Sequence, residues 1–402
     1  MKINFLTQYF DPEPVIRDKK FIRDLANKGN LISVVTGYPN YPTGKIYSGF
    51  KQKIYSKIVI DNFELIRLPL FANKGKNLLL RLLNIFTFFM SLSTYLLFFS
   101  KKKDISYAAN PPPTVAIAAL ILKIFRGTPY IVDILDLWPQ SLESTGFIKN
   151  KSLLKLINLT MNLIYRNALH IIVTSPGMKN TIIKSGINSE KISLIYNWAP
   201  EDRLLIYKKK PIEFKKKGLN LLYAGNIGPA QKIDILIDIA KHFSDKNIDI
   251  NFNIIGTGIS KKDIINKANK LNCNNVFFYP YVDQNEIANY YEAADIGIVK
   301  LNDSNLFKIT IPGKTSAYMA FGLPILMLVS GDAAEIVNNS NCGVSCEPEN
   351  KEQIIKAIEY LYSKKKDELK VLGNNGKDFY NTNISSEIAS NKLNALLHNL
   401  NL

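Results

Sequence analysis

The sequence predicts an α/β protein with two Rossmann-like, doubly wound domains. Short apolar segments alternate with longer segments of helical periodicity along nearly the whole chain. The short segments are apolar on both faces, as are strands of a parallel sheet covered by helices on both sides. They also form two sets, which indicates two doubly wound domains. A length of 402 residues agrees with two domains of roughly 150 residues or somewhat more.

The expected strands follow in chain order. In the first half they cover residues 3–7, 32–36, 65–68, 105–108, 130–134 and 171–174, and in the second half residues 219–223, 252–255, 276–279, 296–301 and 324–329. The stretch from Asn197 to Gly218 separates the sets, because it holds two prolines and two lysine runs and shows no sheet pattern. We therefore expect a first domain over residues 1–200, a second over residues 201–385 and a C-terminal helix over residues 386–402.

The composition excludes several classes of protein. Apolar residues make up 47% of the chain, which rules out disorder, and the three cysteines contain no C-x-x-C pair, which argues against a disulfide framework or a zinc site. No two of the three histidines have the spacing of metal ligands. We therefore expect no metal ion or other cofactor, and a reducing, cytoplasmic location. The first ten residues lack the apolar core of a signal peptide and predict a strand.

The charge balance indicates an anionic partner. Lysine and arginine number 51 against 34 acidic residues, a formal net charge of +17. Nucleic acid, anionic lipid and a phosphorylated substrate would each match this charge. We expect no nucleic-acid binding, because the lysines lie in scattered runs instead of one element with interleaved aromatic residues. Each run taken alone is more typical of a solvated loop.

One segment, residues 82–100, departs from the alternating pattern. It is uncharged and rich in phenylalanine, and its length is near the minimum for a membrane span. Polar side chains form one helical stripe along it: Arg81, Asn84, Thr87, Ser91 and Thr94. The pattern indicates a helix on an anionic membrane surface or a core helix with a polar edge, with a span as the third possibility. On the first interpretation, replacing Phe88, Phe89 and Phe98 with Ser or Gln weakens liposome association.

The loop after the strand at 219–223 is a candidate phosphate site, because ligands of doubly wound sheets bind at the carboxyl ends of strands. Its glycines let the backbone approach a ligand, and the N-terminus of the next helix favours an anion. The residues concerned are Gly225, Asn226 and Gly228, with Gln231 in the expected helix. Glycines between a strand and a helix are also common without any ligand.

A second candidate is the segment 312–316, which opens a helix with Pro312, Lys314 and Thr315. Free N–H groups beside a cation suit a diphosphate, although an ordinary helix cap with a solvated lysine has the same residues. Glu335 begins a later helix, where its carboxylate either holds a ribose diol or complements the helix dipole. The turn at Gly256 lacks the third glycine and the ribose acid of a dinucleotide fingerprint, so we expect no nicotinamide there.

In the first half, polar and aromatic residues follow the expected strands. Asp133 and Asp136 lie at the carboxyl end of a buried strand, where acids are unfavourable unless they are paired or functional. The loops that share this rim carry Arg17, Asn40, Tyr41, Asn110 and Trp138. Aromatic and amide groups on a rim suit sugar binding, yet loops rich in Pro and Gly often serve only as turns.

These segments, in this order, resemble glycosyltransferase family 4, and within it the WbuB-like branch of bacterial polysaccharide enzymes. The matching segments run from residue 8 to about 337: QYFDPE, VVTGYPNYPTGKI, ANPPP, DILDLWP, IYNW, LLYAGNIGPAQ, IIGTG, AADIGIV, IPGKTSAYMAFGLPIL and GDAAEIV. The resemblance implies the GT-B fold, in which two Rossmann-like domains face a central cleft. It also implies that the N-terminal domain binds the acceptor and the C-terminal domain binds a nucleotide-sugar.

The resemblance implies roles for the candidate residues. Lys314 would stabilise the leaving diphosphate, and Asp136 would be the catalytic acid on the acceptor side. The donor site would comprise Gly225, Asn226, Gly228, Gln231, Gly256, Pro312, Lys314, Thr315 and Glu335, and the acceptor site Arg17, Asn40, Tyr41, Asn110 and Trp138. Two glutamates that the family commonly carries are replaced by Ile309 and Ala317. An Arg and a Lys of many relatives are replaced by Asn226 and Gln231, which leaves Lys314 as the main cation for the diphosphate.

We therefore expect a metal-independent, retaining hexosyltransferase of O-antigen, capsule or lipopolysaccharide biosynthesis. The resemblance implies transfer of N-acetyl-L-fucosamine from its UDP donor to an undecaprenyl-diphosphate-linked oligosaccharide. The protein would be peripheral, at the inner face of the cytoplasmic membrane. The alternatives are a transferase of the same fold that uses UDP-GlcNAc, UDP-glucose or GDP-mannose, and an inactive GT-B subunit that scaffolds another enzyme.

Overall fold

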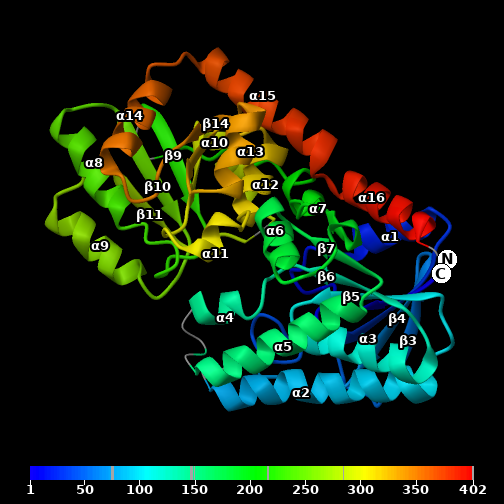
Figure 1. Ribbon diagram of the computed structural model, residues 1–402. Helices are drawn as coiled ribbons and strands as arrows, with labels where there is room; N and C mark the ends of the chain where they lie inside the picture. Colours follow the sequence, from blue (N-terminus) through cyan, green and yellow to red (C-terminus); the bar gives the residue numbers. More distant parts are fainter. Residues whose placement is uncertain (74–76, 145–147, 149, 215–216, 284, 401–402) are drawn as a thin grey trace. The chain divides into compact units, whose positions relative to one another are not determined.

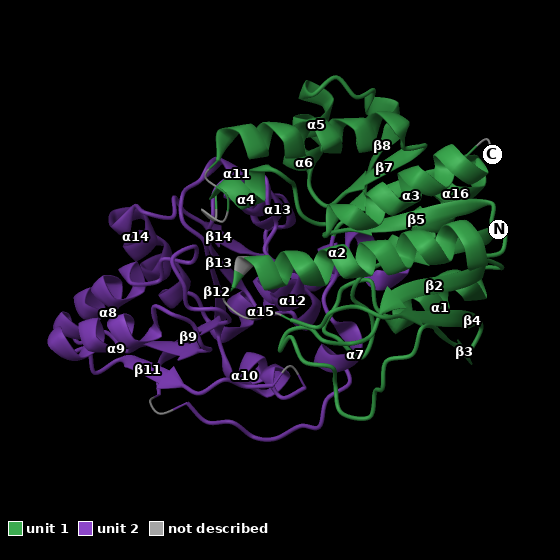
Figure 2. Cartoon of the chain, turned by 90° about the horizontal axis from the view of Figure 1, so that it is seen from below, with its two compact units in different colours: residues 1–196, 389–402 green, residues 197–388 purple. Residues whose placement is uncertain are grey.

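The computed structural model describes residues 1–73, 77–144, 148, 150–214, 217–283 and 285–400. The chain forms two compact units (Figure 2): the first comprises Met1–Tyr196 and Ala389–Leu402, and the second Asn197–Ile388. Each unit is a sheet with helices on both faces (Figure 1). This layering buries both faces of strands that are apolar throughout.

The first unit contains an eight-stranded sheet in the order β3-β4-β2-β1-β5-β6-β7-β8. Neighbouring strands are parallel except for the edge pair β3 and β4, which is antiparallel. The order reverses between β1 and β5, so the loops after these strands flank the crevice where such sheets bind ligands. The strands are β1 Lys2–Leu6, β2 Leu31–Gly37, β3 Ser56–Ile60, β4 Phe63–Leu68, β5 Ile105–Asn110, β6 Tyr130–Ile134, β7 His170–Val173 and β8 Ile192–Leu194. The helices include α1 Lys19–Asn27, α2 Leu78–Thr94, α3 Pro113–Arg126, α4 Gln140–Ser144, α5 Lys151–Asn167 and α6 Pro176–Lys184.

The second unit contains a six-stranded, fully parallel sheet in the order β11-β10-β9-β12-β13-β14. Its order reverses between β9 and β12, which places the loops after these two strands at the ligand-binding crevice. The strands are β9 Leu219–Ala224, β10 Ile250–Ile255, β11 Val276–Tyr279, β12 Ile296–Lys300, β13 Ile325–Leu328 and β14 Gly343–Ser345. The helices are α7 Glu201–Leu204, α8 Ile235–Asp245, α9 Lys261–Lys270, α10 Ile287–Ala293, α11 Asn305–Lys308, α12 Gly313–Phe321, α13 Asp332–Ser340, α14 Lys351–Tyr362 and α15 Lys366–Asn383, followed by α16 Ser386–Asn399, which ends in the first unit.

Every strand expected from the sequence is present, but three strands were not expected. Two of them, β8 and β14, have three residues each, which is too short for a recognisable pattern. The third, β3, has the sequence SKIVI and is largely exposed, because it is an edge strand that pairs on one side only. Its exposed face hides the two-sided apolar pattern that marks the central strands.

Helix α2 presents an apolar surface to solvent and a mixed surface to the sheet. It continues into a π-helical turn, η1, over Tyr95–Phe99. Phe88, Leu92 and Leu96 are fully buried, and the buried Asn84 donates to the main-chain oxygen of Phe71 (2.7 Å). The expectation that Phe88 contacts liposomes is therefore wrong, because this side chain belongs to the core.

Candidate functional site

Two loops of the second unit meet at the carboxyl end of β9. Lys314 lies in the first turn of α12, whose N-cap is Pro312. Its Nζ lies 3.6 Å from the centroid of the Tyr223 ring, near the end of β9. A Cβ atom on Gly225 would lie 2.5 Å from Cε of Lys314, so glycine leaves the room that the lysine occupies. The structure thus brings Gly225 and Lys314 together.

The side chain of Lys314 is partly buried, and no acidic side chain among the described residues pairs with its ammonium group. Burial lowers its pKa to about 7. A partly buried cation that lacks a carboxylate among the described residues gains stability when an anion binds, so this arrangement is typical of a functional site. An arriving anion would raise the pKa and restore the full charge.

The Gly256 turn supports the loop after β9 from behind. The amide of Gly225 donates to the oxygen of Ile255 (2.9 Å), and a Cβ atom on Gly256 would lie 1.9 Å from the oxygen of Gly225. Gly256 also has a φ of +143°, which side-chain-bearing residues rarely adopt. Its role is therefore close backbone packing beneath the candidate phosphate loop.

The rest of this loop is a turn. The side chains of Asn226 and Gln231 hydrogen-bond at 3.0 Å, and the amide of Gln231 donates to the oxygen of Gly228 (3.1 Å). The next helix, α8, begins only at Ile235, so the expectation that Gln231 lies in a helix is wrong. Gly228 and the following proline favour a turn at this point.

Lys300 is a further candidate that the sequence analysis did not single out. It ends β12, is 1% exposed, and its Nζ donates to the oxygen of Leu301 (2.9 Å). Burial lowers its pKa to about 8, and the nearest acid, Glu349, lies 4.0 Å away. The amide of Asn302 donates to the oxygen of Ala230 (2.8 Å), which joins this loop to the loop after β9. The available signal was a lysine inside an apolar strand at the point where the sheet order reverses.

The other donor-side candidates lie in different environments. Thr315 is fully buried, and its Oγ1 has no hydrogen-bond partner among the described residues. Glu335 is exposed in the first turn of α13, and within the described part of the chain it forms no ion pair with Lys314. Ile309 is half-buried and Ala317 is buried. In the same described residues, no three His, Cys, Asp or Glu side chains group as a metal site requires.

In the first unit, Arg17 and Asp133 form a buried ion pair. Nε of Arg17 lies 2.7 Å from Oδ2 of Asp133, and the Tyr107 hydroxyl donates to the same oxygen (2.6 Å). Burial alone would lower the pKa of Arg17, but the facing carboxylate raises it above its ordinary value. This pairing accounts for Asp133, one of the two acids at the end of β6, and holds the loop after β1 against that strand.

Glu13, which the sequence analysis did not assign, organises two acceptor-side loops. Its carboxylate accepts hydrogen bonds from the amides of Phe10 (2.9 Å), Asn40 (2.8 Å) and Tyr41 (2.7 Å). Burial raises its pKa, and these amides oppose the shift. The side chain of Asn40 donates to the oxygen of Tyr38 (2.9 Å). The loop that carries Asn40 and Tyr41 is thus fixed by a buried carboxylate.

Asn110 is the last residue of β5, and Asp136 lies in the loop after the neighbouring strand β6. The oxygen of Asn110 accepts from the amide of Leu135 (2.8 Å). The side-chain nitrogen and oxygen of Asn110 are buried and have no partner among the described residues. Burial raises the pKa of Asp136, although hydrogen bonds from the Trp138 side chain and the Leu137 amide oppose the shift. An unpartnered amide beside a carboxyl of raised pKa suits a hydroxyl-rich ligand.

Comparison with known proteins gives one family model for each half. Residues 24–198 match the glycosyl transferase 4-like domain, and residues 207–379 match the glycosyl transferases group 1. The probable glycosyltransferase WbjE of Pseudomonas aeruginosa is 22% identical over 299 residues, covering 72% of this chain and 74% of WbjE. WcaI of Escherichia coli K12, named for a glycosyl transferase of colanic acid biosynthesis, is 24% identical over 324 residues, covering 77% and 76%.

The solved structures confirm the expected fold class. HepE of Anabaena in complex with UDP-glucose superposes with a TM-score of 0.66 at 16% sequence identity, covering all of both chains. At this identity the likeness concerns the fold, which is GT-B.

Proposed function

Because the chain is a glycosyltransferase of the GT-B type, with a 4-like domain followed by a group 1 domain, we propose that it transfers a sugar from a UDP-sugar to a lipid-linked oligosaccharide. The choice of UDP as the nucleotide of the donor is supported by the likeness to HepE, which is described in complex with UDP-glucose. A role in the synthesis of a surface polysaccharide is supported by the similarity to WcaI, which is named for colanic acid biosynthesis. The WbuB-like segments support N-acetyl-L-fucosamine as the sugar and an undecaprenyl-diphosphate-linked acceptor.

The observation that carries the donor assignment is the ammonium group of Lys314, which has no acidic partner among the described residues. Negative charge builds on the diphosphate as the sugar leaves, and a fixed cation in a dry site stabilises that charge strongly. The free N–H groups at the start of α12 also favour a bound anion, which supports the same assignment. Lys314 thus acts as the group that accepts the leaving diphosphate, and Asp136 acts on the acceptor side of a retaining, metal-independent transfer.

Titration calorimetry with EDTA present tests the donor assignment. We expect binding of UDP with 1:1 stoichiometry and no binding of GDP under the same conditions. Binding of GDP alone would redirect the assignment to mannose or fucose donors. Failure of both nucleotides to bind, with and without acceptor, would contradict the proposal and favour a scaffold subunit.

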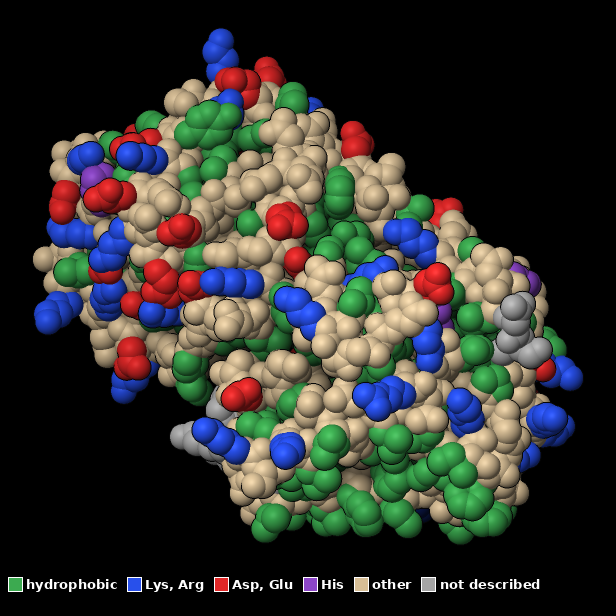
Figure 3. Space-filling view, viewed as in Figure 1, with side chains coloured by type: hydrophobic (Ala, Val, Ile, Leu, Met, Phe, Trp, Pro, Cys, Tyr) green, Lys and Arg blue, Asp and Glu red, His purple; other side chains and the backbone are tan. Residues whose placement is uncertain are grey.

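We also propose that the enzyme is peripheral on the inner face of the cytoplasmic membrane. Three helices of the first unit, α2 with η1, α3 and α5, lie side by side (Figure 1). Apolar side chains are exposed over this part of the unit (Figure 3). We call this surface the three-helix face. Its exposed apolar residues, each 39–76% accessible, are Leu79, Leu82, Leu83, Phe86, Met90, Phe98, Phe99, Ile124, Phe125, Leu153, Leu156, Leu159 and Leu163.

The charge of the three-helix face favours an anionic bilayer. The sequences of α2, η1, α3 and α5 contain no Asp or Glu, whereas each of the three helices carries Lys or Arg. Lys101 and Lys102 are exposed directly after η1. A wide apolar surface bordered by cations matches the interface of a membrane with anionic lipids.

The contacts of α2 favour an in-plane helix over a membrane span. Leu79–Phe99 is long and apolar enough to cross a bilayer, with 22% of its most apolar window buried in the protein. A span would separate the buried Phe88 and Asn84 from the sheet. In addition, Arg126 of α3 donates to the oxygens of Leu96 and Ser100, both at 2.8 Å, which fixes the end of the α2–η1 helix to α3.

A further inference from the structure

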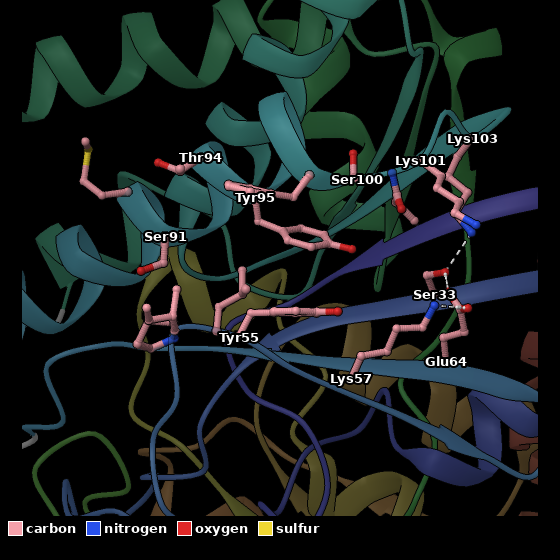
Figure 4. A pocket seen from close by; sticks show the side chains of 16 residues that line it. Ser33, Tyr55, Lys57, Glu64, Ser91, Thr94, Tyr95, Ser100, Lys101 and Lys103 are labelled. Carbon is pink, nitrogen blue, oxygen red and sulfur yellow. Dashed lines mark hydrogen bonds and ion pairs between the residues drawn. The ribbon is translucent and has the colours of Figure 1, made fainter.

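A cavity of about 530 Å³ lies in the first unit between the α2–η1 helix and the edge strands β3 and β4. Figure 4 shows the side chains that line it. Its volume falls within the roughly 300–1,000 Å³ typical of sites for small ligands. No residue assigned above to the donor or acceptor site lines the cavity, so the proposed transfer leaves it without a role.

Two stacked aromatic rings line the cavity, and two of its apolar lining residues are also exposed on the three-helix face. The rings of Tyr55 and Tyr95 stack with their centroids 6.3 Å apart and their planes 25° apart. Met90 and Phe99 line the cavity and also belong to the exposed apolar residues of α2 and η1. An alkyl chain bound in the cavity would therefore lie against side chains that also belong to the three-helix face.

One end of the cavity is cationic. Lys57, Lys101 and Lys103 gather there around Glu64 and Ser33 (Figure 4). Lys103 donates to the Ser33 hydroxyl (2.7 Å), which in turn donates to Glu64 (2.7 Å), and Lys57 pairs with Glu64. One carboxylate faces three ammonium groups, so this end keeps an excess of positive charge. The exposed Lys101 makes no ion pair in the described residues.

We propose that this cavity binds a long-chain alkyl phosphate, with the phosphate at Lys101 and Lys103 and the chain on Tyr55 and Tyr95. The inference rests on the proposed membrane location, because the three-helix face brings the cavity to the lipid. A polyprenyl phosphate and an anionic glycerophospholipid share this chemistry. The apolar lining residues and the cationic end together exclude a simple polar anion or a neutral lipid as the preferred ligand.

Two neighbouring lysines provide a matched pair of variants. Lys101 lines the cavity, whereas the next residue, Lys102, is also exposed but lies outside the lining. Both Lys101→Gln and Lys102→Gln remove one positive charge, so both weaken binding to anionic vesicles to the same small extent. Only Lys101→Gln removes a proposed phosphate contact. Ser91 lines the cavity from α2, so Ser91→Phe reduces the cavity volume without changing the charge.

The test is calorimetric titration of the full chain with decyl phosphate below its micelle concentration, with decyltrimethylammonium and inorganic phosphate as comparison ligands. We expect decyl phosphate to bind best, Lys101→Gln to weaken it about tenfold, and Lys102→Gln to leave it within twofold. We expect Ser91→Phe to abolish it while the melting temperature and vesicle binding persist. Farnesyl phosphate and dihexanoyl phosphatidylglycerol then distinguish the two natural sources.

Three outcomes would overturn the proposal. Equal binding of decyltrimethylammonium and decyl phosphate would show that the cavity does not select a phosphate. Equal weakening of decyl phosphate binding by both lysine variants would show that only overall charge matters, without a specific contact of Lys101. Unchanged binding in a folded Ser91→Phe protein would place the ligand elsewhere. If vesicle binding fails while decyl phosphate still binds at Lys101, the cavity site stands and the membrane location is the proposal that fails.

Discussion

The ammonium nitrogen of Lys314 is held 3.6 Å from the centre of the Tyr223 ring, across the space that Gly225 leaves open. The ring faces the cation with its electron-rich surface, which stabilises the charge only partly in a buried setting. A lysine held in this way is oriented before the ligand arrives. Four expectations follow from this site, from the three-helix face and from the candidate acceptor site of the first unit.

Replacing Lys314 with Met should lower kcat/KM at least about a hundredfold, because removal of one preorganised group that stabilises a developing anion costs about that much. Methionine keeps most of the side-chain volume, so the melting temperature should not fall. Lys262→Met, at an exposed position on α9, is the control and should retain full activity. Activity within threefold of the original in a folded Lys314→Met protein would remove this residue from the mechanism.

The affinity for UDP should fall as pH rises above 7. Burial sets the pKa of Lys314 at about 7 in the unliganded protein, so the protein above this pH must take up a proton to bind the diphosphate. The apparent affinity should then drop by about tenfold per pH unit. Calorimetry at pH 8 in two buffers of different ionisation enthalpy measures the uptake. Lys314→Met should show none, and uptake that persists there would assign the proton to another group.

Replacing Phe98 and Phe99 together with Ser should weaken binding to anionic vesicles at least tenfold. Both side chains are more than 70% exposed, and full burial of one such side chain contributes about 1.5–3 kcal/mol. Ile259→Ser, at a site 84% exposed in the second unit, is the control for loss of an exposed apolar group. Unchanged sedimentation of the double variant with vesicles would argue against the three-helix face.

Replacing Asn110 with Ala should raise the KM for the acceptor and leave the affinity for UDP unchanged. Both polar atoms of this buried amide lack a partner among the described residues, so its removal should not lower the melting temperature, and relief of the unpaired groups favours a small increase. Initial rates at varied acceptor concentration measure the effect. A fall in melting temperature with unchanged KM would make Asn110 a structural residue.

The sequence predicts the sheets well because a two-sided apolar strand leaves a strong local signal. It also places Gly225 and Lys314 in separate candidate phosphate loops, since the carboxyl ends of strands are where such ligands bind. Their contact through Tyr223 depends on which strands are neighbours, and this order is not a local property of the chain. The resemblance to a family adds the GT-B fold to this α/β prediction, and the solved structures confirm it.

Other features depend on contacts between residues far apart in the sequence, and the sequence alone does not predict them. Glu13 acts through amides of a loop almost thirty residues away, and nothing in its own segment indicates this role. In the sequence Lys300 is part of an apolar strand, and only the order of the strands brings the loop after it to the loop after β9. The polar stripe of α2 was identified correctly as a stripe, but its burial is set by the sheet that packs against it.

Through Asn84, helix α2 contacts the acceptor-side loops as well as contributing to the three-helix face. One side of the helix carries the apolar residues of the three-helix face, while on the other the Asn84 amide accepts from Gln8 (2.7 Å) and donates to Asn40 (3.3 Å) in the acceptor-side loops. Ordering of α2 by a bilayer would therefore also order the acceptor-side loops that hydrogen-bond to Asn84. Any factor by which bound lipid tightens binding of the acceptor is then, by reciprocity, the factor by which bound acceptor tightens binding of the lipid.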